Sequence, residues 1–297
     1  MSIFFCQPAD LDFAVVIAGR PPHVELELPP PRLTLHSPTM SVTEILCLLA
    51  AAMAAGAINA VAGGGTLLTF PTLLFFGTPP ILANATNTFA LLLGTAGSLF
   101  GYRRQINAVK PWLWQFVPVS LLGSLLGGVL LTHTDPKIFS RLVPFLILFA
   151  TGLFLAQGIF RRFAGLEPQD GQAPKHHTVW AAVVFQFAVA LYGGYFGAGI
   201  GILMLASLGF IGLANIHQTN ALKTVLAAVI NLAASVWFVC TGLIDWPRAG
   251  VITVGALAGY YLGSHYSQRI PQARVRQTII IIGVILSAVT FYKEFLR

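Results

Sequence analysis

Long apolar stretches separated by short polar ones make up most of the chain. Eight of them are about 20 residues long and fall at about 43–62, 81–101, 111–133, 138–160, 179–196, 217–241, 247–267 and 275–295. About 20 apolar residues form a helix long enough to cross a bilayer, in which the backbone must satisfy its own hydrogen bonds. The runs are continuous rather than alternating, which favours helices over strands. The pattern predicts an all-α polytopic membrane protein with about eight transmembrane helices.

Two shorter apolar stretches, 66–76 and 200–212, each follow a group of glycines. The first follows Gly63-Gly64-Gly65 and the second follows Gly197-Ala198-Gly199. At ~1.5 Å per residue, each reaches only about half-way across ~30 Å of hydrocarbon. We expect them to be broken helices or re-entrant segments.

The two glycine groups belong to an internal duplication. Thr86-Asn87 follows the first group and Thr219-Asn220 the second, with the asparagine 22 and 21 residues after the last glycine. The sequence therefore predicts two homologous membrane repeats, 40–160 and 179–297, joined by a cytoplasmic linker at 161–178. Internal repeats of this kind are typical of secondary transporters.

The distribution of cations favours inverted repeats. Basic-rich connections occur at 102–110, 161–178 and 268–276, whereas the others carry fewer cations, Arg248 among them. If each half crosses the membrane five times, all three basic-rich connections lie on the cytoplasmic side and both termini lie outside. With eight crossings these connections would be divided between the two sides, and that alternative stays open.

The first 39 residues differ from the rest, with several acids, a proline cluster and one short apolar run. They form either a disordered N-terminal extension or a mis-assigned start, in which case Met40 is the initiator. We expect no packed structure in this segment.

Composition narrows the functional class. The chain is 56% hydrophobic and 9% charged, too few charges for a water-exposed surface, and its net charge of +7 fits basic cytoplasmic loops better than a nucleic-acid partner. The cysteines are scattered, Glu44 lies at the start of a span, and Asp245 lies in a loop. With no carboxylate within a span and no catalytic motif, we expect no metal, no cofactor and no enzymatic activity.

The glycine breaks are the candidate binding site. A helix that restarts inside the membrane exposes backbone N–H groups and a positive dipole end, which an anion satisfies. The predicted substrate-binding residues are Gly63, Gly64, Gly65, Thr66, Asn87, Gly197, Gly199, Gly201, Asn220 and Lys223. The alternative is that the glycines only allow close helix packing, as expected for the Gly123/Gly127 and Gly255/Gly259 pairs.

Lys223 is the one basic residue well inside a predicted span. A charge at that depth is costly, which indicates a functional role, here a cation for the anion. The alternative is that its side chain extends to the membrane surface. The corresponding position in the first half is Ala90, so the predicted site is asymmetric.

The repeat motifs resemble those of a known family. "AGGGTLLTFPTLLFFG" with "ANATN", and "GGYFGAGIGILM" with "HQTNALKTVLAAVINLAASVWFVCTGLIDWP", resemble the TauE/SafE sulfite exporters, also called 4-toluene sulfonate uptake permeases, over about 43–295. Met204 stands where many members have proline.

The resemblance implies a multi-pass transporter of sulfite or organosulfonates in the bacterial cytoplasmic (inner) membrane. Its partners would be a small anionic substrate and the lipid bilayer, and a homo-oligomer stays open. The alternative function is an anion channel that uses the same glycine-break site.

Overall fold

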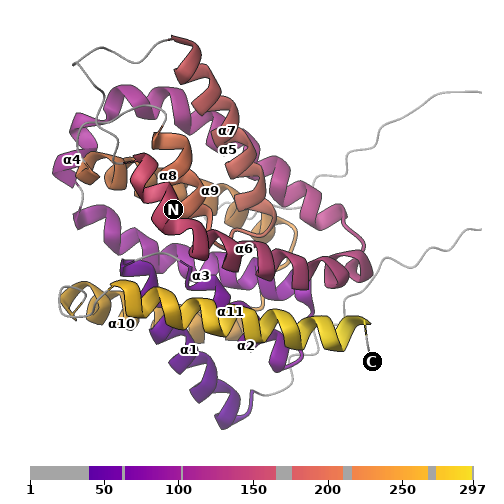
Figure 1. The fold of residues 1–297 in the computed structure, drawn as a ribbon. Coiled ribbons are helices and arrows are strands. Elements are labelled where there is room, and N and C mark those ends of the chain that lie inside the picture. Colours follow the sequence, from indigo (N-terminus) through magenta and orange to yellow (C-terminus); the bar gives the residue numbers. More distant parts are fainter. Residues whose placement is uncertain are drawn as a thin grey trace, which may run out of the picture.

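The computed structural model describes residues 40–61, 64–101, 103–164, 176–209, 216–266 and 272–295. The predicted N-terminal extension, most of the predicted linker and Gly63 lie outside these ranges. The described residues form helices and no strands (Figure 1). The helices are α1 (Val42–Val61), α2 (Thr66–Phe75), α3 (Pro80–Gly101), α4 (Arg103–Ala108), α5 (Lys110–His133), α6 (Pro136–Ala164), α7 (His176–Tyr195), α8 (Ile200–Gly209), α9 (Ile216–Cys240), α10 (Trp246–Tyr266) and α11 (Gln272–Phe295).

The all-helical prediction is confirmed, and the ends of most helices follow from local sequence. Proline opens α3 and α6 and is the second residue of α5 and α10, positions where its missing N–H costs nothing. At the end of α2, Gly77 has a positive φ of 82° and the N–H of Thr78 donates to the carbonyl of Leu73 at 3.1 Å. This is a glycine C-cap. The short helix α4 was not predicted, because its polar residues indicated a loop.

Four of the described helices contain stretches that are both long enough and apolar enough to cross a membrane: Val42–Asn59, Lys110–His133, Pro136–Ala156 and Gln218–Cys240. Large apolar side chains are exposed on the outside of the bundle, including Leu122 on α5 at 60% and Leu148 on α6 at 53%. Such a surface suits lipid rather than water. The structure is that of a multi-pass membrane protein, and the count of eight crossings stays a prediction.

Two helix pairs, α1 with α10 and α5 with α7, are packed backbone to backbone. Each pair consists of one helix from the first half of the chain and one from the second half. A Cβ atom at Gly259 of α10 would lie 2.0 Å from the carbonyl oxygen of Met53 on α1. At Gly127 of α5, a Cβ atom would lie 2.1 Å from the carbonyl oxygen of Leu191 on α7. The expected packing role of these glycines is confirmed. In Figure 1, α5 and α7 lie together in the upper part of the molecule, and α1 and α10 in the lower part.

A buried ion-pair cluster joins α1 to α10. The Nε of Arg248 donates to Glu44 at 2.8 Å and its Nη1 donates to Asp245 at 2.5 Å. The backbone N–H of Asp245 donates to the hydroxyl of Thr86 on α3 at 3.0 Å. Arg248, which the sequence placed among the loop cations, is only 7% exposed. It therefore serves to neutralise two carboxylates rather than to face the cytoplasm or the exterior.

Candidate functional site

The first break lies between α1 and α2. Gly64 has φ of +101°, a conformation that side chains disfavour, and α2 begins at Thr66 as predicted. The N–H of Gly65 donates to Oδ1 of Asn59 at 2.7 Å, and the N–H of Leu67 donates to the carbonyl of Gly64 at 3.0 Å. The N–H of Gly65 is therefore already used by the protein. The N-cap residue of α2 is Gly65, so no side-chain cap covers the first turn of this helix.

Asn59 was not predicted to belong to this break. Its signal in the sequence is local: it is a single amide in an otherwise apolar segment, six residues before the glycine that it binds.

A polar pair lies beside the first turn of α2. The hydroxyl of Thr69 donates to Oδ1 of Asn87 on α3, and both residues are buried, at 0% and 1% exposure. The Nδ2 atom of Asn87 has no hydrogen-bond partner among the described residues. A buried amide donor without a partner is costly and calls for a ligand or a water molecule. Asn87 therefore offers one or two N–H donors close to the N-terminus of α2.

The second break lies between α7 and α8 and, like the first, contains glycines with positive φ. Gly197 and Gly199 have φ of +78° and +77°, α7 ends at Tyr195 and α8 begins at Ile200. The N–H of Gly197 donates to the carbonyl of Tyr192 at 3.1 Å, and the hydroxyl of Tyr192 donates to the carbonyl of Ala198 at 2.7 Å. Tyr192, which the sequence analysis did not single out, thus holds the shape of this turn.

Lys223 lies beside the start of α8. Its Cδ atom is 3.9 Å from the position of a Cβ atom at Gly201, the second residue of that helix, and its side chain is half-buried. The structure thus brings together these two predicted site residues. Asn220, one turn earlier on α9, is also half-buried, and within the described residues no hydrogen bond joins its side chain to either break.

Both breaks contact neighbouring residues of α6. A Cβ atom at Gly64 would lie 2.0 Å from Cζ of Phe154, and one at Gly199 would lie 3.4 Å from Cδ1 of Leu153. The elements of the two halves also meet directly. The Nδ2 of Asn84 donates to the carbonyl of Tyr195 at 3.0 Å and so caps α7.

An aromatic contact also joins α2 to the second break. The rings of Phe70 on α2 and Phe196 at the second break are 5.3 Å apart and perpendicular. The two glycine breaks, 135 residues apart between Gly64 and Gly199, therefore both contact the same stretch of α6.

The ring of Phe154 lies directly over Gly64, a feature that the sequence analysis missed. Phe154 is fully buried, and its ring tip occupies the place where any other residue at position 64 would put its Cβ atom. The sequence predicts that the backbone at this break is open to an anion. In this conformation the backbone at Gly64 is covered by an aromatic ring, and the donor without a partner among the described residues is Nδ2 of Asn87.

Comparisons with known proteins agree with this architecture. A "Probable membrane transporter protein" of Haemophilus influenzae is 31% identical over 243 residues, which cover 80% of this chain and 90% of the relative. YfcA of Escherichia coli K12, also named a probable membrane transporter protein, is 26% identical over 247 residues, 81% of this chain and 87% of the relative. ORF9 of Sinorhizobium sp, with the same description, is 27% identical over 245 residues, 81% and 89% of the two chains.

No solved structure matches the chain. These relatives are described as transporters and not as enzymes. The family model described as "Sulfite exporter TauE/SafE" matches residues 48–290, which include both glycine breaks and the packed helix pairs. The chain belongs to the TauE/SafE family of sulfite exporters.

Proposed function

We propose that the protein is a carrier that moves small sulfur-containing oxyanions, sulfite or organosulfonates, across the bacterial inner membrane. The observation that carries this proposal is the unpartnered Nδ2 of the buried Asn87 at the N-terminal turn of α2. The N–H of Thr66 and the positive end of the α2 dipole lie at the same turn. A buried N–H donor without an acceptor, beside a positive dipole end, suits an oxyanion better than a cation.

The second break supplies the charge in this proposal. Lys223 contacts the first turn of α8 at Gly201, so its ammonium and the α8 dipole would both favour an anion. The complete proposed set comprises Gly63, Gly64, Gly65, Thr66, Asn87, Gly197, Gly199, Gly201, Asn220 and Lys223. Because both breaks contact α6, one small substrate could be held between them.

Replacement of Asn87 tests this function directly. Asn87→Leu removes the amide and should lower the affinity for sulfite roughly ten- to a hundredfold. This range corresponds to the loss of one hydrogen bond to a charged group, which contributes about 1.5–3 kcal/mol. Asn87→Asp should be more harmful, because the new carboxylate repels an anion. The measurement is concentration-dependent uptake of radiolabelled sulfite and sulfonates into proteoliposomes, normalised to inserted protein.

Counterflow in the same proteoliposomes, together with electrical recording from a bilayer, separates a carrier from a channel. Saturable flux with counterflow supports a carrier, whereas large ohmic currents would show an anion channel at the same site. Flux that Asn87→Asp preserves or increases would contradict an anion site at Asn87.

Lys223 gives a second test in the same assay. If its ammonium binds the substrate, Lys223→Ala should weaken the apparent affinity roughly ten- to a hundredfold. Lys223→Arg should retain part of the affinity, and Lys223→Glu should be worse than alanine. Lys137→Ala, which removes an exposed cation at the start of α6, is the matched control. Equal affinities for Lys223→Ala and wild type would mean that Lys223 only extends to the membrane surface.

We further propose that the two halves are inverted repeats. The packed pairs support the repeat itself, because the contact of Gly259 with Met53 corresponds to that of Gly127 with Leu191. The distribution of basic connections at 102–110, 161–178 and 268–276 favours inversion of the two halves. In the repeat, α1 of the first half corresponds to α7 of the second, and α5 of the first half corresponds to α10 of the second. The α1–α10 pair is therefore equivalent to the α7–α5 pair. A reporter fused at Gly171 should then be cytoplasmic and one fused after Arg297 external. If both fusions report the cytoplasm, the inverted ten-crossing arrangement is wrong and the eight-crossing arrangement replaces it.

The movement that gives alternating access must then keep α1 packed on α10 and α5 packed on α7. Rocking of one sequence half against the other would separate α1 from α10 and α5 from α7, which are in backbone contact. We therefore infer that each mixed pair moves as one body, and that the movement occurs where α6 meets the two breaks. The ring of Phe154 would have to leave Gly64 for the substrate to reach the backbone there.

A further inference from the structure

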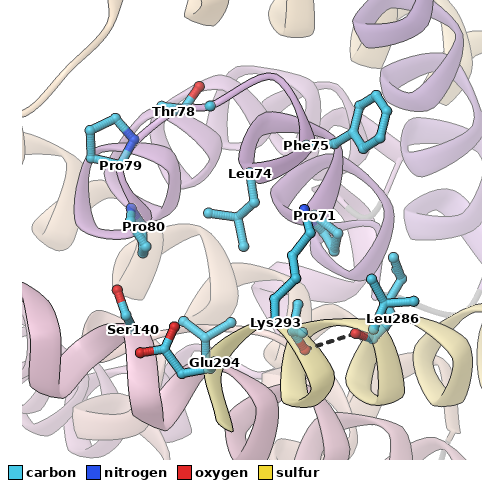
Figure 2. Close-up of a pocket in the computed structure, with 14 residues that line it drawn as sticks. Pro71, Leu74, Phe75, Thr78, Pro79, Pro80, Ser140, Leu286, Lys293 and Glu294 are labelled. Atoms are coloured by element: carbon cyan, nitrogen blue, oxygen red, sulfur yellow. Dashed lines mark hydrogen bonds between the residues drawn. The ribbon is translucent and has the colours of Figure 1, made fainter. Parts of the chain in front are cut away.

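A second site is present away from the glycine breaks. A cavity of about 340 Å³ lies between the end of α2, the turn into α3, the start of α6 and the end of α11 (Figure 2). This volume lies in the range of sites that hold small organic molecules, about 300–1,000 Å³. None of the residues that line it belongs to the proposed anion site.

The walls of this cavity are mostly apolar. Phe75 of α2 and Val289 of α11 line it and are exposed, at 75% and 46%. The other apolar wall residues are Pro71, Leu74, Pro79, Pro80, Val143 and Leu286. The side of the cavity formed by Phe75 and Val289 can therefore accept a hydrocarbon chain from the surrounding lipid.

Two residues of opposite charge, Lys293 and Glu294, line the cavity. Lys293 and Glu294 both line it and both are exposed, in the last turn of α11. Consecutive residues on a helix do not face each other. In Figure 2 the side chain of Lys293 extends towards α2, whereas that of Glu294 lies near Ser140 of α6. Within the described residues both ion pairs involve Arg248, so neither of these two charges is paired.

The position of the charges matches a membrane surface. They lie at the end of an apolar helix, and charged residues near helix ends extend to the headgroup region. A cation and an anion on consecutive residues, next to apolar walls, are complementary to a headgroup that carries a phosphate and an ammonium group.

We propose that this cavity binds a zwitterionic phospholipid with a primary ammonium headgroup, of the phosphatidylethanolamine class. Lys293 binds the phosphate, Glu294 accepts hydrogen bonds from the ammonium, and one acyl chain lies against Phe75 and Val289. Phosphatidylglycerol is anionic and has no ammonium group, so Glu294 repels its headgroup. A choline lipid has the charge but no N–H to donate, so it gains less from Glu294.

Native mass spectrometry of the full chain in mild detergent tests this site. The protein is mixed with equal amounts of phosphatidylethanolamine, phosphatidylcholine and phosphatidylglycerol that have the same acyl chains. Wild type should retain the ethanolamine lipid on the order of tenfold more than either other lipid, as expected for one charge-assisted hydrogen bond. Glu294→Gln should lose the preference over phosphatidylglycerol, and Lys293→Gln should lower retention of all three.

Lys137→Gln is the matched control, because Lys137 is an exposed cation at the start of α6 that does not line the cavity. These side chains are exposed, so their replacement should leave the fold intact, and monodisperse elution of each variant in size-exclusion chromatography checks this. Preference of wild type for phosphatidylglycerol, equal retention of all three lipids, or an unchanged preference in Glu294→Gln would each overturn the proposal.

Discussion

Gly64→Ala is expected to abolish transport, because position 64 has no room for a side chain. The new Cβ atom would lie 2.0 Å from Cζ of Phe154, whose ring is fully buried and cannot turn away without wider movement. The backbone would also be strained, since φ at Gly64 is +101° and a side chain there costs about 1–2 kcal/mol. Both effects act at the break that positions Thr66 and α2.

Sulfite flux into proteoliposomes, normalised to inserted protein, measures this effect. Gly77→Ala is the matched control: Gly77 also has a positive φ, of 82°, but nothing lies within 4 Å of a Cβ atom there. It carries the backbone strain without the steric clash and should retain flux. Addition of Phe154→Ala to Gly64→Ala should restore part of the activity. If Gly64→Ala transports as well as Gly77→Ala, the first break is only a spacer.

Arg248→Met is expected to remove most of the folded protein. Arg248 neutralises Glu44 and Asp245, and the side chains of Arg248 and Glu44 are each 9% exposed. Loss of the cation leaves two carboxylates close together in a poorly hydrated place. Removal of one partner from a buried ion pair costs about 3–5 kcal/mol, a large part of the stability of a typical domain.

The thermal unfolding midpoint of the purified protein in detergent measures this loss. Arg141→Met is the control, because Arg141 is exposed on α6. Glu44→Gln should be milder than Arg248→Met, since Arg248 keeps Asp245 at 2.5 Å. Similar midpoints for Arg248→Met and Arg141→Met would show that the cluster does not stabilise the fold.

The elements that local sequence determines were predicted closely. The short segment predicted at 66–76 is α2, Thr66–Phe75, because glycine on one side and a glycine cap on the other both interrupt an apolar run. The packing glycines were likewise predicted, since small residues four apart form a groove on one face of a helix.

The partners of these elements were not predictable from local patterns. Phe154 is one of 22 phenylalanines, and nothing in the apolar middle of α6 marks it as the residue over Gly64. The pairing of Arg248 with Glu44 joins residues 204 positions apart. Such contacts depend on which helices lie side by side, and a single sequence contains no direct record of that. The anion site therefore stays a proposal, although two of its predicted residues, Gly201 and Lys223, are now seen to be neighbours.

The pairing of α1 with α10 also sets a demand on biosynthesis. Glu44 is made 204 residues before its partner Arg248. At a synthesis rate of about 5–20 residues per second, it waits roughly 10–40 s for that cation. During this time α1 lies in the membrane without α10, so the face on which the α10 glycines pack is uncovered and Glu44 has no cationic partner. The nascent chain therefore depends on lipid headgroups or on the insertion machinery until α10 arrives, and a ribosome stalled before Arg248 should leave α1 more open to proteolysis than the finished protein does.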